Sequence, residues 1–504
     1  MSSKIENDKS ELFSAMSSPD SDIERYEPPQ NAESTTANLL RSVTQYTELS
    51  VSNGEAEARE EMKKKNGETN DTKLQGTSFF AKDGGKARKT FFKQYIPIIL
   101  ILCSYLLAVF SIYWGSLYQR SSRLVNLKVL VSVEDDRSGI ITKSLLDAIN
   151  APSVKEMSGW TVRNYTSEED TKKLVHEQKY WGAIYVSSPD ISKQLISGFH
   201  GNTSASNITT VKGYYETAND IIGVPNYVKT AFIALNNVYT EIMKSEVYPS
   251  IIANLTSSEF SDLKDSRILT NFPEIELTDG NPLTNYTLMA PMQVGLIYII
   301  ILCLFQMLWF IKLNGDMAPL LRPGHYIAYR LVLSQCNYLI LSLFYATLNR
   351  AFQVDMQRTW KGGFVVFWMF SYLIMSACGG ACEVIGTITM AVLPPLMGFW
   401  LLFFIILNVS ATFAPIQVCP GIFKIAYALP IRNGYDLMSV VLMNTYKGDV
   451  GRCIGVLIAW IVLNNIFLPF SVIFYAYMGK KKVKKQAAAK RVLEQESKAN
   501  AVTE

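Results

Sequence analysis

The sequence predicts a membrane α-helical protein with six transmembrane helices in a one-plus-five layout and an α/β extracytoplasmic domain between the first two. Three observations predict this fold. One isolated apolar segment, Tyr95–Trp114, carries no charge and is long enough to cross a hydrocarbon core of ~30 Å. A long hydrophilic segment rich in N-x-S/T sequons follows it. Further apolar segments then crowd the chain from Ala290 to Met478.

The composition agrees with a membrane protein. The chain has 504 residues, of which 49% are hydrophobic and only 18% are charged, against about 25% charged in soluble domains. A formal net charge of +4, without a basic stripe among aromatic residues, argues against nucleic acid as a partner. The first apolar segment begins too late in the chain to be a cleavable signal peptide, so we expect a retained signal anchor.

The remaining apolar segments predict five further spans, at 290–311, 327–348, 364–388, 396–413 and 454–478. The fourth and fifth of the six spans are the hardest to separate, because no charged residue lies between Glu383 and Lys424. Pro394 and Pro395 mark the expected break, since consecutive prolines remove amide donors. A merged helix would instead leave five spans and place the two termini on opposite sides of the membrane.

Basic residues flank the membrane block at both ends, before the first span from Lys82 to Lys93 and after the last span from Lys480 to Arg491. The positive-inside rule therefore predicts that both termini are cytosolic, which requires an even number of spans. The basic run after the last span is read as an anchor of this topology or as a contact with anionic lipids.

Glycosylation sequons support the same orientation, because glycosylation requires the lumenal side. Five of them lie between the first two spans, and we treat their asparagines as candidate glycosylation sites: Asn164, Asn202, Asn207, Asn254 and Asn285. Asn70 and Asn408 also match, but the first lies in the predicted cytosolic tail and the second inside a span, so we expect neither to be used.

These assignments divide the chain into segments with different expected roles. In chain order they are a disordered cytosolic tail (1–90), the first transmembrane helix (91–118), the extracytoplasmic glycosylated domain (119–289), a five-helix membrane domain (290–478) with a lumenal hairpin at 415–453, and a basic cytosolic tail (479–504). The first tail is polar and has few large apolar residues, so it cannot bury enough surface to offset chain entropy.

The extracytoplasmic segment alternates between strand-like and helix-like patterns. Short β-branched runs predict strands at 127–133, 160–164, 182–186 and 209–215. Helical spacing predicts helices at 140–149, 168–178 and 190–196 and a long one over 225–255. Such alternation favours a parallel or mixed sheet covered by helices.

The positions of the cysteines favour a role in helix packing over metal binding or catalysis. Five of the seven fall inside predicted spans, where a thiol packs as a small apolar group. Cys419 and Cys453 both fall in the lumenal hairpin and are a candidate disulfide. Cys378 and Cys382 share a helix face, but no histidine lies near them in the sequence, so close helix contact is favoured over a metal site.

Catalytic motifs are not found. The sequence contains no G-x-x-x-x-G-K-[ST] phosphate loop, no G-x-S-x-G elbow and no H-E-x-x-H helix. We therefore expect a protein that is not an enzyme, with no ATPase activity of its own, no catalytic residues and no cofactor or metal.

Four polar residues within the membrane block are candidate intramembrane sites: Glu383, Asn408, Asn464 and Asn465. A charge inside a span is costly and is by default a functional candidate. Glu383 lies either within the lipid or at a helix end that faces water, and the sequence leaves both open. The asparagines are expected to hydrogen-bond between helices.

The lumenal hairpin carries a family resemblance. CPGIFKIAYALPIRNGYDLMSVVLMN, from Cys419 to Asn444, resembles the hairpin before the last helix of ABC-type exporter permeases. WGAIYVSSPDISKQL, Trp181–Leu195, resembles the strand, proline and helix of their extracytoplasmic domain. With the one-plus-five layout, the chain most resembles the fungal nitrosoguanidine-resistance protein family, over about 91–478.

The resemblance implies a multi-pass, permease-like transporter linked to drug resistance, for export of small toxic compounds of the nitrosoguanidine type or for movement of lipids. Its expected partners include membrane lipids. Because the sequence shows no ATPase, we also expect a homodimer, a separate ATPase subunit or a lipid-transporting pump as a partner. The alternative is a non-transporting membrane regulator or scaffold that affects lipid organisation or another transporter. The sequons require the secretory pathway; the resemblance favours the plasma membrane, and span lengths also allow the endoplasmic reticulum.

Overall fold

The computed structural model describes residues 85–200, 211–262 and 274–502. The chain from Ser78 to Ala488 forms one compact unit, which contains a mixed β-sheet and most of the helices. The sequence-based expectations for the N-terminal tail, for Asn70 and for the sequons at Asn202 and Asn207 lie outside the described residues.

A five-stranded mixed sheet lies between the first two long apolar helices of the chain. Its strands, in spatial order, are β2 (Gly159–Arg163), β1 (Lys128–Ser132), β3 (Gly182–Val186), β4 (Val211–Tyr215) and β5 (Ile275–Asp279). β1 pairs in parallel with β2 and with β3, β3 pairs antiparallel with β4, and β4 pairs in parallel with β5. The first four strands are those that the β-branched runs predict, and β5 is an addition.

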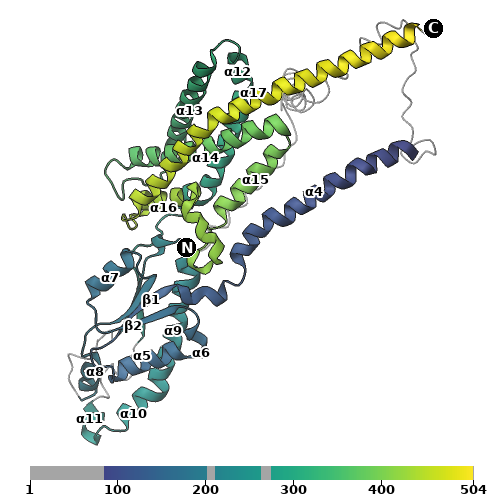
Figure 1. Ribbon diagram of the computed structural model, residues 1–504. Helices are drawn as coiled ribbons and strands as arrows, with labels where there is room; N and C mark the ends of the chain where they lie inside the picture. Colours follow the sequence, from purple (N-terminus) through teal and green to yellow (C-terminus); the bar gives the residue numbers. More distant parts are fainter. Residues whose placement is uncertain (1–84, 201–210, 263–273, 503–504) are drawn as a thin grey trace, which may run out of the picture. The chain divides into compact units, whose positions relative to one another are not determined.

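Helices cover both faces of this sheet (Figure 1). Because side chains alternate along a strand, Val129 and Val131 of β1 face one core, whereas Leu130 faces another. The larger core is shared with α5 (Ile140–Asn150), α8 (Ile191–Phe199) and α9 (Lys229–Ile242), and the smaller with α7 (Glu168–His176). We call this sheet with its helices the α/β unit.

The long helix expected over 225–255 is present as a continuous helical run with two π-helical turns. It consists of Val224–Val228 (η5, π), α9, Met243–Val247 (η6, π) and α10 (Tyr248–Ile252). A short α6 (Pro152–Lys155) and α11 (Ser257–Asp262) complete the helices of the α/β unit. The helices expected at 140–149, 168–178 and 190–196 correspond to α5, α7 and α8.

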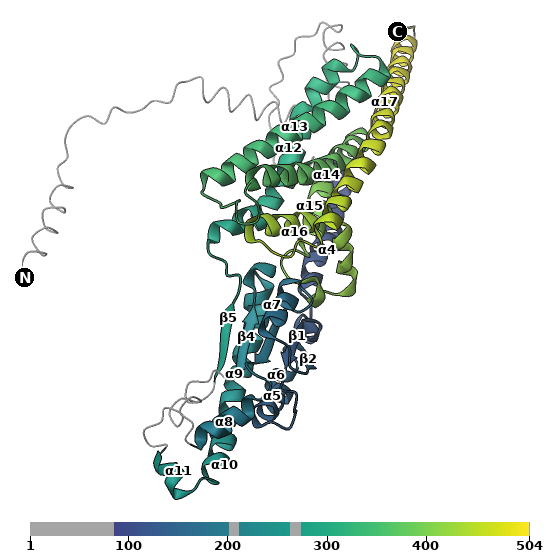
Figure 2. The same ribbon diagram turned by 90° about the vertical axis from the view of Figure 1, so that its left-hand side faces the viewer.

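Among the described residues, five helices are long and apolar enough to cross a membrane, so the protein is a membrane α-helical protein. They are α4 (Gly85–Leu117), α12 (Gly295–Met317), α13 (Pro323–Ala351), α14 (Gly363–Val392) and α17 (Val450–Val502). Figure 2 shows α12, α13 and α14 with α17 beside them. α14 is the central helix of this group, because it packs against α12, α13 and the hairpin helix described below.

The fifth of the six predicted spans is a shorter helix in the structure. α15 covers Leu396–Val409, 14 residues, and is about 21 Å long at 1.5 Å per residue. The break before it lies at Leu393–Pro395, where the paired prolines predict one. The helix ends before Phe413 because the chain turns at Ser410. The six-span layout and its orientation therefore stay a prediction, whereas five long apolar helices are observed.

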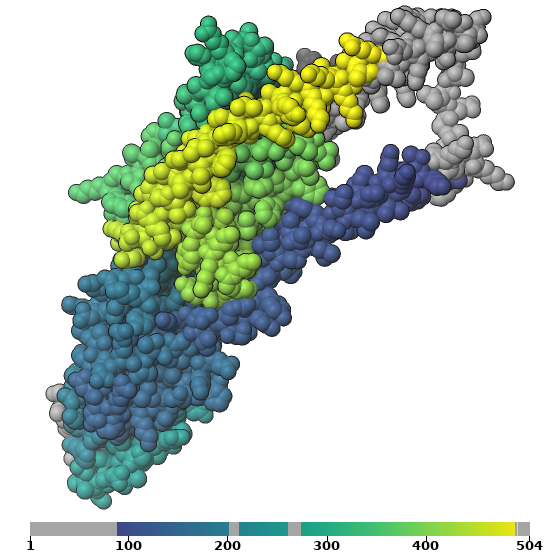
Figure 3. Space-filling view, in the orientation of Figure 1, coloured from purple at the N-terminus to yellow at the C-terminus, as the bar shows by residue number. Residues whose placement is uncertain are grey.

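α4 has a different environment from the other long helices. Most of its side chains are exposed, including the apolar Leu100, Ile101 and Leu107. Figure 3 shows α4 in dark blue, with much of its surface uncovered. Its main helix contact is with α15, where the Tyr105 ring meets Phe399 edge-on at 4.3 Å. A helix with an exposed apolar surface of this kind is suited to contact with lipid tails.

The hairpin between α15 and α17 combines a mostly exposed 3₁₀ segment with a buried helix. It contains two 3₁₀ segments, Ile416–Val418 (η11) and Gly421–Ala428 (η12), and then α16 (Pro430–Met443). Most side chains of α16 are buried against α14 and neighbouring helices. At Gly434 a Cβ atom would lie 2.7 Å from the Ile374 side chain of α14, so the two helices are in close contact there.

Candidate functional site

Glu383 lies within α14, nine residues before the final residue Val392, and its residue is only 3% exposed. This position is about 14 Å along the helix from its end, at 1.5 Å per residue. Of the two readings left open by the sequence, the structure therefore has the carboxylate inside an apolar helix bundle, not at a helix end. An isolated charge in such surroundings is strongly unfavourable, so the Glu383 carboxylate requires polar partners that stabilise it.

The carboxylate has two partners on α13. The Ser334 hydroxyl donates to it, at 2.6 Å from Oε1 and 2.8 Å from Oε2. The guanidinium of Arg330 lies 4.0 Å from Oε2, and that residue is 8% exposed. Serine and arginine one turn apart on α13 thus face the same carboxylate. Removing one member of a buried ion pair typically costs about 3–5 kcal/mol, because the other charge stays buried.

Two further polar side chains lie beside Glu383: Tyr338 of α13 and Gln306 of α12. Both are buried; the Tyr338 hydroxyl interacts with the Glu383 carboxylate, whereas Gln306 Oε1 has no hydrogen-bond partner. Because buried polar groups are nearly always satisfied, this unused capacity marks a place for a polar group or water. Glu383, Arg330, Ser334, Tyr338 and Gln306 are referred to below as the Glu383 cluster.

The three predicted asparagines lie elsewhere in the bundle. Asn408 is fully buried, and its Oδ1 accepts from the Ile431 N–H at 3.3 Å, which ties α15 to α16. Asn464 of α17 donates to the Ala377 carbonyl of α14 at 2.8 Å. Asn465 is partly exposed. Asn408 and Asn464 thus join helices, and in the described part of the chain none of the three asparagines hydrogen-bonds to the Glu383 cluster.

Cys419 and Cys453 are both buried free thiols in the structure, so the candidate disulfide is not formed. The two belong to different cores. Cys419 packs with Leu127 and Phe423 near the end of α4, whereas Cys453 packs with the bundle around α14. Their common place in the hairpin sequence suggested proximity, but the two thiols pack into different cores.

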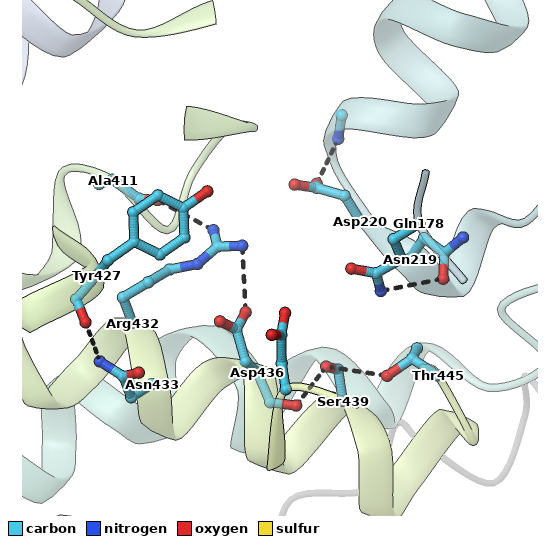
Figure 4. A network of polar contacts seen from close by, with 12 residues as sticks. Gln178, Asn219, Asp220, Ala411, Tyr427, Arg432, Asn433, Asp436, Ser439 and Thr445 are labelled. Atoms are coloured by element: carbon cyan, nitrogen blue, oxygen red, sulfur yellow. Dashed lines mark hydrogen bonds and ion pairs between the residues drawn. The ribbon is translucent and has the colours of Figure 1, made fainter. Parts of the chain in front are cut away.

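A second polar network lies where the α/β unit meets α16 (Figure 4). Arg432 pairs with Asp436 one turn later at 3.1 Å, and Arg452 of α17 approaches Asp436 at 3.7 Å and Asp449 at 3.4 Å. On the opposite side, Asp220 of the α/β unit faces Arg432. Sequence patterns did not predict this network, although the spacing of four residues between Arg432 and Asp436 in an apolar hairpin is a local signal for it.

Asp220 is 1% exposed and only half satisfied. Its Oδ1 accepts from the N–H groups of Ile222 at 3.1 Å and Gly223 at 2.6 Å, whereas Oδ2 has no hydrogen-bond partner. Burial raises the pKa of this carboxyl above its ordinary value, although the Arg432 charge opposes the shift. Burial likewise raises the pKa of Asp436.

A cavity of ≈ 90 Å³ lies beside this network. Its walls come from the α/β unit, from α16 and from the start of α17, and they are more polar than apolar. Gln178 and Asn219 contribute amides, and Arg432, Asp436 and Arg452 contribute charges. The cavity therefore connects residues that are far apart in the sequence.

The position where parallel α/β sheets usually bind ligands is filled by the protein itself. That position is the carboxyl end of β1 and β3, where the strand order reverses. Glu134 lies there, 2% exposed, and accepts from Ser192 N–H at 2.7 Å, Ser192 Oγ at 2.6 Å and Thr142 Oγ1 at 2.8 Å. A carboxylate thus takes the place that an anionic ligand would occupy at the start of α8.

The described sequon asparagines between α4 and α12 lie on the surface. Asn164, Asn254 and Asn285 are exposed, and they follow β2, α10 and β5 respectively. Asn408, by contrast, is buried, as expected for an unused sequon. No group of three metal-ligating side chains arranged to hold an ion is found in the described part of the chain.

Comparison with known proteins adds family membership. Residues 98–466 match the family described as protein of unknown function DUF3533. The chain is 29% identical over 419 residues to an uncharacterized endoplasmic reticulum membrane protein of Saccharomyces cerevisiae, which covers 78% of this chain and 82% of the relative. No solved structure matches. Since the family model spans most of the sequence, this membrane protein belongs to the DUF3533 family.

Proposed function

We propose that the protein is a permease-like membrane protein that moves a small toxic compound of the nitrosoguanidine type, or a lipid, across its membrane. The Glu383 cluster is the observation that carries this proposal. It combines a buried carboxylate, a guanidinium 4.0 Å away, a tyrosine hydroxyl and a glutamine oxygen without a hydrogen-bond partner, all inside an apolar helix bundle. Ionisable groups at such positions typically belong to transport pathways.

The loose geometry of the ion pair supports a role beyond packing. A good charge-assisted hydrogen bond has a donor–acceptor distance of about 2.7–2.9 Å, which the Arg330–Glu383 separation of 4.0 Å exceeds. Such a pair can exchange one partner for a polar group of a passing cargo at a smaller cost than a tight one. Tyr338 and Gln306 add a donor and an acceptor at the same place.

Energy and location complete the proposal. The protein has no ATPase of its own and is not an enzyme, so transport depends on a separate ATPase subunit, a lipid-transporting pump or a homodimer. Membrane lipids surround it. The endoplasmic reticulum is the compartment named for the yeast relative, and we propose it in preference to the plasma membrane.

Flux measurements on reconstituted full-length protein test this function. Wild-type protein should move a fluorescent lipid or a labelled alkylating compound between leaflets, and Glu383→Gln should reduce the rate at least tenfold, because the carboxylate charge is lost. Glu276→Gln is the matched control, since Glu276 is exposed on β5. Equal rates in the wild type, Glu383→Gln and empty vesicles would contradict transport.

A non-transporting regulator or scaffold is the second candidate. It is favoured by the extent of packing between the α/β unit, α16 and the bundle, which suits a receptor-like module that reports to a partner. Affinity capture from membranes separates the two functions. Recovery of a nucleotide-binding subunit supports transport, whereas recovery of a complete lipid-transporting pump, combined with absence of flux, supports regulation.

A further inference from the structure

The cavity beside α16 has a balanced set of charges. Arg432 and Arg452 contribute two positive charges, and Asp436 and Asp449 contribute two negative charges, so its lining is close to neutral. A lining of this kind has no net charge that would attract a simple anion or cation. It does offer an opposite charge to each end of a molecule that carries both signs. Charge balance therefore points to a zwitterion rather than to a simple anion or cation.

The charged groups of the cavity are available for exchange. Arg452 lies 3.4 Å from Asp449 and 3.7 Å from Asp436, both longer than a good charge-assisted hydrogen bond of about 2.7–2.9 Å. The Arg452 side chain is 36% exposed and the Asp449 side chain 55% exposed. An anionic group of a ligand can thus replace a carboxylate at Arg452, while an ammonium group pairs with Asp449.

Aromatic residues supply a second kind of contact. Trp181 of the α/β unit and Tyr446, which precedes α17, both line the cavity. Rings beside carboxylates are the usual surroundings of a bound ammonium group, because the ring face attracts a cation. Gln178 and Asn219 add amides that hydrogen-bond to oxygen atoms.

The cavity also lies at the end of a membrane-spanning helix. Arg452 and Cys453 belong to the first turn of α17, whose apolar part is long enough to cross a membrane. The headgroups of phospholipids occupy the layer next to the hydrocarbon core, at the ends of such helices. A headgroup can therefore reach this position without leaving the bilayer surface.

We propose that this cavity binds a small zwitterion that carries an ammonium group and an anionic group, with Asp449 and Arg452 as the respective partners. The headgroup of phosphatidylethanolamine and free phosphoethanolamine share this chemistry, and the position of the cavity favours the lipid. The site is separate from the Glu383 cluster and does not depend on whether the protein transports anything.

Binding to full-length protein in detergent micelles tests the proposal. Phosphatidylethanolamine should raise the melting temperature and remain bound in native mass spectrometry, whereas phosphatidylglycerol at the same mole fraction should do neither. Arg452→Gln should weaken binding about tenfold, as expected for the loss of a charge-assisted contact. Arg322→Gln, at an exposed position before α13, is the matched control and should bind as the wild type does.

Asp449→Asn is the second variant, because its exposed side chain makes a folding defect improbable and it removes the ammonium partner. It should also weaken binding. Soluble phosphoethanolamine distinguishes the two sources: stabilisation by it alone identifies a free zwitterion, and stabilisation by the lipid identifies a headgroup. Absence of binding by both, equal binding of phosphatidylglycerol, or unchanged binding in both variants would overturn the site. Unchanged binding in Glu383→Gln would separate this result from the transport proposal.

Discussion

Three buried carboxylates of this protein show how their partners decide their roles. Glu134 accepts three short hydrogen bonds just beyond the carboxyl end of β1 and is fully satisfied. Glu383 has a serine and a more distant guanidinium. Asp220 has one oxygen that accepts two N–H groups and one that accepts none. The first is structural, and the other two keep unused capacity for interaction.

Asp220→Asn should stabilise the protein at neutral pH. The amide keeps an oxygen for the N–H groups of Ile222 and Gly223 but removes a buried charge, and an unsatisfied buried group costs about 1–3 kcal/mol. Melting temperatures of full-length protein in detergent measure the effect. A lower melting temperature for Asp220→Asn at neutral pH would show that the charge is needed by Arg432.

The same residue sets an expected pH dependence. Because the folded-state pKa of Asp220 is raised by burial, the folded protein binds more protons than the unfolded chain above the ordinary carboxyl pKa. Stability then falls as pH rises from the ordinary carboxyl pKa through the raised one. Melting curves across this range should show a smaller fall for Asp220→Asn than for the wild type, and parallel curves would contradict the assignment.

The residue scale is also where the sequence was least informative. Glu383 was recognised because a charge in an apolar segment is visible without a structure. The proximity of Asp220 to Arg432 was not, since the two residues are 212 positions apart and no local pattern connects them. The expected Cys419–Cys453 disulfide was wrong for a related reason. Two residues of one hairpin can pack into different cores, and the sequence does not show which core each thiol joins.

At the scale of elements, local patterns predicted more. The β-branched runs predicted four strands, and the paired prolines predicted the break before α15. β5 was missed, although Ile275 and Leu277 alternate with polar residues before Asp279 and Gly280. Alternation over so few residues, isolated beyond a long polar segment, is a weak local signal, and the strand is stabilised by pairing with β4.

Close contact of α13 and α14 gives a prediction at this scale. A Cβ atom at Gly379 would lie 2.3 Å from the Tyr338 ring, so Gly379→Ala should destabilise the bundle by about 1–3 kcal/mol through overpacking. Gly398→Ala on α15 is the matched control, because a Cβ atom there meets nothing within 4 Å. It should be neutral or stabilising by up to about 1 kcal/mol. Equal melting temperatures for the two variants would contradict the small-residue contact.

At the scale of the whole molecule, five long apolar helices and one shorter one leave the number of crossings to be measured. If α15 crosses with the others, both ends of the chain lie on one side; if it does not, they lie on opposite sides. The basic residues in the first turns of α4 and after the apolar part of α17 favour the first arrangement. The α/β unit then faces the lumen.

Glycosylation mapping tests that arrangement. Asn164, Asn254 and Asn285 are exposed on the α/β unit and its connection to α12, so a lumenal unit should carry glycans at these positions. Replacing each asparagine by glutamine should increase gel mobility by one glycan step, and endoglycosidase treatment should abolish the differences. Asn408→Gln should leave the mobility unchanged, because Asn408 is buried in the bundle. Unaltered mobility in all three exposed variants would contradict the glycosylated lumenal unit.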